Sequence, residues 1–290
     1  MHTYQLSDLF DEVNRRRQAG DYGGAASLLL QAQAGIDQLE MGDTLFAANV
    51  ANALGVIYKY TGRFSEAERL YRQALETIVR ECGSESEAAA SVYHNLGGLA
   101  HARRDYAAGE ADARRAVAVR ERLLGLDHPV VAEDLAALAA LLDGLERYDE
   151  SRPIYSRVLA IFEKAHGPEH YEIAINLNNL AAVAWQQGEW EEAERLFLQA
   201  LALKEKLLGA DHPDTAVTLN NLAALYRKQA RYVEAEASYR RALTIFEACF
   251  GPEHPSTQTC AANLDQLLLK NGQQVNDRQN AIVYGIDQSI

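Results

Sequence analysis

Residues 212–251 read HPDTAVTLNNLAALYRKQARYVEAEASYRRALTIFEACFG, and this stretch decides the fold. Apolar residues recur at helical spacing over 217–226 and again over 232–246. Pro213 stands where the first helix would begin, a place at which its missing N–H costs nothing, and Gly251 stands where the second would end. The stretch therefore predicts two antiparallel helices joined by a short loop.

The same pattern returns along the chain with a period of 42 residues. Four kinds of residue keep this period independently: histidines, glycines, leucines and aromatic residues. The four series are His128, His170, His212 and His254; Gly83, Gly125, Gly167, Gly209 and Gly251; Leu54, Leu96, Leu138, Leu180, Leu222 and Leu264; and Tyr22, Phe64, Tyr106, Tyr148, Trp190 and Tyr232. Four series with one period indicate an internal repeat, and each period is predicted to fold as one helix pair.

Small residues at fixed places in the period explain how the helices would pack. Ala223, Ala235 and Ala242 return as small residues in other periods. Small side chains let helix axes approach to the lower end of about 8–10 Å. One helix pair cannot bury both of its faces, whereas stacked pairs share a continuous core. We therefore expect an all-α fold, a right-handed α-solenoid of about six helix-turn-helix repeats plus a C-terminal capping helix.

The register places these elements along the chain. The repeats are expected at about residues 5–40, 44–83, 86–125, 128–167, 170–209 and 212–251, followed by the capping helix at 255–271. A cap is expected because the exposed end of a solenoid must be covered. Residues 1–272 would thus form a single solenoid, and 273–290 a C-terminal tail. The apolar stretch 281–286 is either a frayed end or a segment that docks on the solenoid or on a neighbouring molecule.

The repeat resembles the tetratricopeptide repeat (TPR), and its 42-residue period resembles the kinesin-light-chain subclass of that family. The residues that carry the resemblance are His212-Pro213-Asp214, Asn220-Asn221-Leu222-Ala223, Tyr226, Tyr232-Val233-Glu234-Ala235-Glu236, Tyr239 and Arg241-Ala242-Leu243. It covers about residues 5–270. It implies a solenoid that scaffolds protein partners, but it names no partner, because one fold serves many functions.

Composition limits the partners and the compartment. Twenty-eight Lys and Arg face forty-one Asp and Glu, a net charge of −13, which disfavours nucleic acid and anionic membranes. No run of apolar residues is long enough to span a bilayer, and no basic and apolar leader opens the chain. Cys82, Cys249 and Cys260 are expected to be free thiols in a reducing compartment. We therefore expect a cytoplasmic protein that binds neither nucleic acid nor membranes.

The sequence holds no motif of an enzyme. A nucleophile motif, a phosphate-binding loop and a dinucleotide-binding glycine pattern are all missing, so we expect no catalysis and no cofactor. The periodic histidines would lie roughly 10 Å apart, whereas zinc needs ligands at about 2 Å. They are therefore expected to shape the loop that enters each first helix, and no metal site is expected.

Arginines crowd the third repeat. They are Arg103, Arg104, Arg114, Arg115, Arg120 and Arg122. We expect a solvated face that nearby acids balance; the alternative is a docking patch for an acidic partner.

Asparagines recur just before the periodic leucine of the first helices. Asn95, Asn179 and Asn221 directly precede the leucine, and Asn52, Asn178 and Asn220 stand one residue earlier. Asparagine is mediocre inside a helix, because its side chain competes for backbone hydrogen bonds. In the family that the chain resembles, these positions line a concave groove, and a carboxamide there binds the main chain of an extended peptide. Alternatively, each asparagine bonds a neighbouring repeat and fixes the register.

A second row of groove residues follows from the same register. Its members are Lys59, His101, Asp143, Trp185 and Arg227, one in each repeat. Their mixed charges and single large aromatic ring would select the side chains of a partner. In the fourth repeat Ala136 and Ala137 replace the asparagines, so the groove would be split into two sites. The lysine clamp of chaperone-binding TPR proteins is missing, so heat-shock chaperone tails are not expected.

The leading functional prediction is a non-enzymatic adaptor that binds a peptide or partner segment in its concave groove. The first alternative is a self-assembling structural scaffold that uses the solenoid ends or residues 281–286 and forms a homo-oligomer. The second is a peptide-sensing regulator of the bacterial TPR type, although such regulators usually carry an output domain.

Overall fold

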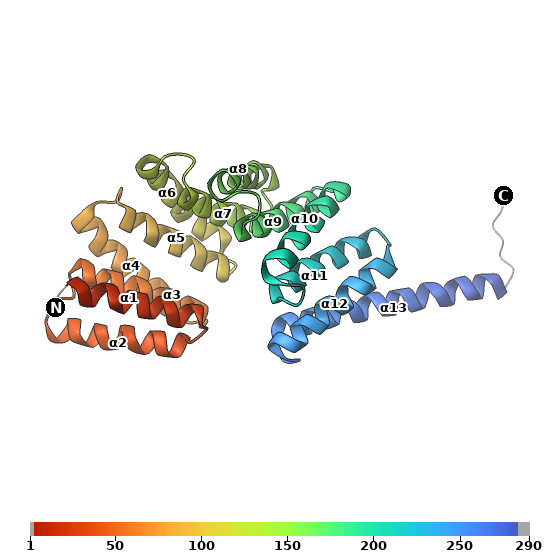
Figure 1. Cartoon of the computed structure of the whole chain (residues 1–290), viewed down its shortest axis with the longest axis horizontal. Coiled ribbons are helices and arrows are strands. Elements are labelled where there is room, and N and C mark those ends of the chain that lie inside the picture. Colours follow the sequence, from red (N-terminus) through yellow and green to blue (C-terminus); the bar gives the residue numbers. More distant parts are fainter. Residues whose placement is uncertain (1–2, 284–290) are drawn as a thin grey trace. The chain divides into compact units, whose positions relative to one another are not determined.

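The computed structural model describes the backbone of residues 3–283 and the side chains of residues 8–269. Within this part, the chain forms thirteen α-helices and no strand, which confirms the predicted all-α solenoid of TPR helix pairs (Figure 1). The helices are α1 (Thr3–Gln18), α2 (Tyr22–Gln38), α3 (Leu45–Tyr60), α4 (Phe64–Cys82), α5 (Glu87–Ala102), α6 (Tyr106–Leu124), α7 (Pro129–Gly144), α8 (Tyr148–His166), α9 (Tyr171–Gln186), α10 (Trp190–Leu208), α11 (Pro213–Lys228), α12 (Tyr232–Phe250) and α13 (Pro255–Val283).

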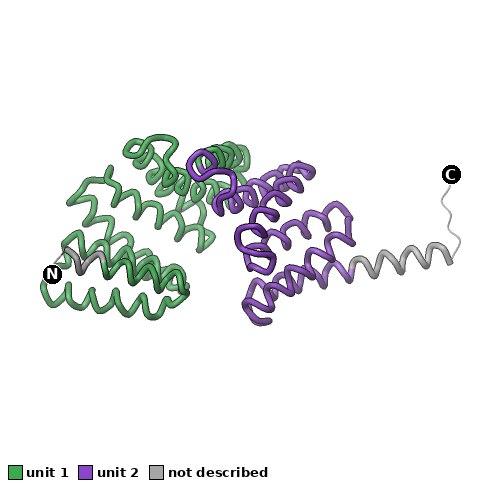
Figure 2. The backbone as a smooth tube through the Cα atoms, in the orientation of Figure 1, with its two compact units in different colours: residues 1–161 green, residues 162–290 purple. Residues whose placement is uncertain are grey.

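The chain divides into two compact units, residues 1–161 and residues 162–290, with the boundary inside α8 (Figure 2). Odd-numbered helices are the first, and even-numbered helices the second, members of their pairs. The single solenoid expected over residues 1–272 stays a prediction, so each unit is described by itself.

The first helices begin at side-chain caps. At His128, His170, His212 and His254 the imidazole Nδ1 accepts the backbone N–H two residues later, at 3.2, 3.3, 3.1 and 3.2 Å. The hydroxyls of Thr44 and Ser86 cap α3 and α5 by accepting the backbone N–H three residues later. An imidazole can accept through Nδ1 when its hydrogen lies on Nε2. The prediction that the periodic histidines shape the entry to each first helix is confirmed.

Removal of one such cap should destabilise the second unit measurably. His212→Ala is expected to lower the free energy of unfolding by about 1 kcal/mol, because the N–H of Asp214 loses its acceptor. His212→Ser should retain most of the stability, since Ser86 performs this task in α5. Urea denaturation of the two variants checks this, and equal losses for alanine and serine would contradict the capping role.

Second helices end at a glycine in five of the six pairs. Gly83, Gly125, Gly167, Gly209 and Gly251 have φ between 80° and 97°. The ψ of Gly83 is 159°, a combination that residues with a Cβ essentially never adopt. The first pair has Met41 at this place, and its α2 ends at Gln38.

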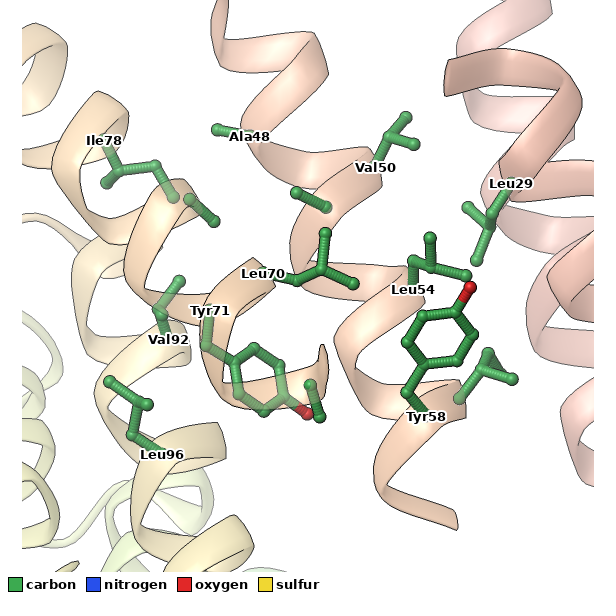
Figure 3. Close-up of a cluster of buried hydrophobic side chains, with 14 of the residues drawn as sticks. Leu29, Ala48, Val50, Leu54, Tyr58, Leu70, Tyr71, Ile78, Val92 and Leu96 are labelled. Atoms are coloured by element: carbon green, nitrogen blue, oxygen red, sulfur yellow. The ribbon is translucent and has the colours of Figure 1, made fainter. Parts of the chain in front are cut away.

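Buried aliphatic side chains make up most of the core of the first unit, and the rings of Tyr58 and Tyr71 lie among them (Figure 3). A Cβ added to Gly55 would lie 2.6 Å from the ring of Tyr71, so this ring packs directly against the backbone of α3. In the third repeat Ala113 takes the place of the ring and faces Gly97. Ala113 is the exception at this packing position, which holds a ring in four other repeats: Tyr71, Tyr155, Phe197 and Tyr239.

In each unit, a buried cationic side chain joins two neighbouring helices. In the first unit, Arg120 of α6 is 7% exposed and donates to the carboxylate of Asp134 on α7 at 2.7 Å. In the second unit, Lys204 of α10 is 4% exposed and donates to the hydroxyl of Thr218 on α11 at 2.9 Å. Burial lowers the pKa of the Lys204 ammonium, because the apolar surroundings disfavour its charge.

The last helix departs from its predicted length. The expected end of the capping helix at residue 271 is wrong, because α13 continues past Gly272 to Val283. Glycine inside a helix costs only about 1 kcal/mol relative to alanine, and no proline follows it here. Of the apolar stretch 281–286, residues 284–286 and the side chains of 281–283 lie outside the described part.

Candidate functional site

The asparagines of the first helices form hydrogen bonds across repeats. In the first unit, Asn95 on α5 donates through Nδ2 to Oδ1 of Asn52 on α3, at 2.9 Å. In the second unit, Asn221 donates to Asn178 and Asn263 donates to Asn220, each at 3.4 Å. We call these three bonds the asparagine ladder. They show that asparagines do bond neighbouring repeats, as the register interpretation expected; peptide binding by the same residues stays a prediction.

The ladder orients the asparagine amides and leaves part of their hydrogen-bonding capacity free. A carboxamide has two donor hydrogens and an acceptor oxygen with two lone pairs, so one ladder bond leaves most of this capacity. The side chains of Asn52, Asn95, Asn179, Asn220 and Asn221 are partly exposed, whereas Asn178 is buried. The exposed amides can therefore still meet the N–H and C=O groups of another chain.

In the first unit, the histidine beside the ladder bonds differently. His94 occupies the slot of Asn52 one repeat later, where the ladder would need an amide at position 137. Ala137 supplies none, and Nδ1 of His94 instead contacts Oδ1 of buried Asp134 at 2.7 Å. Within this unit the ladder stops at Ala137, because alanine has no amide; the split of the groove into two sites stays a prediction.

The second row of the first unit brings three titratable groups together. A Cβ added to Gly98 would lie 3.4 Å from Nζ of Lys59, so this ammonium rests on the backbone of α5. Burial lowers the pKa of Lys59. Burial also lowers the pKa of His101, with Lys59 adding to the effect and Asp143 opposing it. Burial raises the pKa of Asp143, which accepts a hydrogen bond from Tyr155 at 2.7 Å.

The second row of the second unit forms an open hollow. Trp185, Ala224, Arg227, Lys228 and Gln266 line a space of about 360 Å³, and Arg227 donates to Gln266 at 3.2 Å. The structure thus brings the predicted residues Trp185 and Arg227 together. Sequence reasoning missed Lys228, which directly follows a predicted residue, and Gln266, which lies one turn before the equivalent slot of α13.

No three of the His, Cys, Asp and Glu side chains within 8–269 gather as a metal site. No helix within the described chain is long and apolar enough to cross a bilayer. Cys82, Cys249 and Cys260 are free thiols, and burial raises the pKa of the Cys260 thiol to about 11, which makes it a poor nucleophile.

Acids pair with five of the six arginines that crowd the third repeat. Arg103 pairs with Glu68, Arg114 with Glu110 and Glu150, Arg115 and Arg122 with Glu85, and Arg120 with Asp134. Arg120 is the exception to the expected solvated face, because it is buried.

The tetratricopeptide repeat family model matches residues 16–77, 88–164, 138–206, 172–248 and 214–274. The chain belongs to the tetratricopeptide repeat family. This TPR chain has no significantly similar sequence among curated proteins. Its fold is typical of non-enzymatic scaffolds for protein–protein interaction.

Several solved TPR structures are similar to this chain. BtubC (BKLC) from P. vanneervenii has 22% sequence identity and a TM-score of 0.64, over 79% of this chain and 92% of that one. A putative kinesin light chain with nearly identical TPR-like repeats from Podosopora anserina has 22% identity and a TM-score of 0.59, over 69% and 94%. A Rap protein complexed with competence and sporulation factor has 14% identity and a TM-score of 0.62, over 98% and 94%. The kinesin-light-chain-like neighbours confirm the predicted family resemblance; at these identities the similarity concerns the fold alone.

Proposed function

We propose that this TPR chain is a non-enzymatic adaptor that binds an extended segment of a partner protein along the asparagine-bearing face of its first helices. The observation that carries the proposal is the asparagine ladder. Inter-repeat bonds at 2.9 and 3.4 Å hold partly exposed amides in fixed orientations, so little conformational entropy is lost when they bind a peptide main chain. TPR proteins in general bind proteins or peptides, and the similar Rap structure contains competence and sporulation factor.

The two units offer different side-chain chemistry to such a segment. The first unit presents Lys59, His101 and Asp143, a row of mixed charge. The second unit presents Trp185 and Arg227, an aromatic ring and a cation beside an open hollow. We infer two binding stretches with different sequence preferences. The self-assembly and peptide-sensing alternatives stay predictions.

The test compares wild type with variants of the asparagines. A partner captured from a lysate and identified by mass spectrometry is titrated calorimetrically against each protein. Asn179→Ala removes a partly exposed amide that makes none of the ladder bonds of the described chain, and it should weaken binding by about 1–3 kcal/mol. Asn178/Asn179/Asn220/Asn221→Ala should abolish detectable binding.

The matched control is Gln199→Ala, which removes an exposed amide from the second helix α10. It should bind the partner like wild type. All proteins must first show the same helical circular dichroism and the same urea midpoint, because ladder bonds also join repeats. Unchanged affinity of the fully folded Asn179→Ala and quadruple variants would refute the proposal, and recovery of the chain itself as the only ligand would favour self-assembly.

A further inference from the structure

The turn between α2 and α3 carries an apolar pocket that shares no residue with the asparagine ladder. We propose that this pocket is a second docking site, which takes one apolar side chain of a partner segment whose flanking residues are Lys or Arg. The site belongs to the first unit alone. It does not depend on the proposed groove, so the two proposals can fail separately.

The pocket originates in one residue of the repeat. In five pairs the slot after the second helix holds a glycine with φ of 80–97°, and in the first pair it holds Met41. Methionine does not adopt that conformation, and the chain turns one residue earlier, at Glu40 with φ of 51°. Helix α2 therefore has 17 residues, whereas α4 has 19. The missing half-turn leaves part of the core beneath it uncovered.

The walls of the pocket are mostly apolar. The pocket is lined by one polar residue, Gln31, and by Ala32, Gly35, Ile36, Leu39, Met41 and Phe46, and its volume is about 220 Å³. That is below the roughly 300–1,000 Å³ of sites for whole drug-sized ligands, so the space suits a single side chain such as leucine. Leu39 is 65% exposed and Met41 37% exposed, and contiguous exposed apolar side chains commonly mark interaction sites. Nothing lies within 4 Å of the Cβ position of Gly35, which keeps the floor open.

Acidic residues form a rim beside the pocket, and this rim favours a positively charged partner. Asp37, Glu40 and Asp43 are exposed acids in the same short stretch of chain. Within the described chain, Arg80 pairs with Asp43 at 3.8 Å, and Asp37 accepts a bond from the neutral amide of Gln33. The rim thus keeps a net negative charge, in line with the net −13 of the whole protein. Cationic flanks complement this rim, whereas acidic flanks are repelled.

Two synthetic nine-residue peptides test the site on the full-length chain. Both carry a central leucine, one between lysine and arginine residues and the other between glutamates. The chain has only two methionines, so ¹³C-methyl labelling gives a Met41 signal that Met41→Leu assigns. The basic peptide should shift this signal and bind in fluorescence anisotropy. The acidic peptide, and a basic peptide with a central alanine, should bind at least about tenfold more weakly.

Variants separate the pocket from nonspecific attraction. Met41→Gly restores the glycine of the other pairs and should reduce binding of the basic peptide about tenfold or more. Glu40→Lys should also weaken it, whereas Val233→Ala, at an exposed apolar residue of α12, should not. The proposal is overturned if the acidic peptide binds equally, if Met41→Gly binds like wild type, or if the Met41 signal stays unmoved at saturation. A concentration-dependent dimer that Met41→Gly dissolves would also overturn it, by assigning the pocket to a second copy.

Discussion

Replacement of Asp134 by alanine is expected to lower the free energy of unfolding of the first unit by about 3–5 kcal/mol. Asp134 is 1% exposed, and its Oδ1 lies 2.7 Å from Nη1 of Arg120 and 2.7 Å from Nδ1 of His94. Without the carboxylate, the Arg120 guanidinium stays buried with its charge unbalanced. The Nε of Arg120 already lacks a hydrogen-bond partner within the described residues. Local rearrangement would therefore compensate little for the lost carboxylate.

The preceding repeat supplies the control for this prediction. The slots of Arg120 and Asp134 hold Ile78 and Val92 there, both buried. The double variant Arg120→Ile/Asp134→Val should therefore be as stable as wild type or more stable by about 1–4 kcal/mol, because a packed apolar pair avoids the desolvation of two charges. Urea denaturation of Arg120→Ile, Asp134→Val and the double variant completes a double-mutant cycle. Arg114→Ala, which removes an exposed ion pair, should cost less than about 1 kcal/mol. A double variant as unstable as Asp134→Ala would contradict this account.

Replacement of Tyr71 by alanine should lower the free energy of unfolding by a similar amount, about 3–5 kcal/mol. Tyr71 is fully buried, and its ring rests on the backbone of Gly55, so alanine would leave a cavity between α3 and α4. Its hydroxyl has no hydrogen-bond partner within the described residues. Tyr71→Phe should therefore keep or raise stability, and the equivalent slot in α10 already holds Phe197. Equal destabilisation by alanine and phenylalanine in urea denaturation would show that the hydroxyl matters more than the ring.

The same tyrosine predicts a dependence of stability on alkaline pH. Burial raises the pKa of Tyr71, and it raises the pKa of Tyr155 and Tyr239 at the equivalent positions. The folded state therefore holds these protons more tightly than the unfolded state does. Stability is fully present below the ordinary tyrosine pKa of about 10 and falls as the pH rises above it. Tyr71→Phe should shift the alkaline midpoint, followed by circular dichroism, to higher pH. Identical alkaline midpoints for Tyr71→Phe and wild type would contradict the assignment.

The asparagines show where prediction of the site from the sequence stops. Their recurrence indicated a shared task, because asparagine inside a helix otherwise weakens it. Two tasks fitted that pattern, a bond between repeats and a bond to a peptide. The contact between Asn95 and Asn52 joins residues 43 positions apart, and only the packing of α5 against α3 reveals it. The ladder makes the two tasks compatible, since it leaves part of each exposed amide unused.

The helix pairs and their family were predictable from the amino-acid sequence. So were the histidines at which first helices begin and the glycines at which second helices end. These features depend on the spacing of residues along the chain, such as the period that links His170 to His212. That spacing is visible in the amino-acid sequence. Only the tertiary structure decided that Arg120 meets Asp134, that Lys228 and Gln266 border the hollow at Trp185, and that Met41 opens a pocket. The physical reason is that these contacts depend on which side chains of neighbouring helices face each other, and on where a turn must shift when a glycine is missing. Neither is encoded by any single helix.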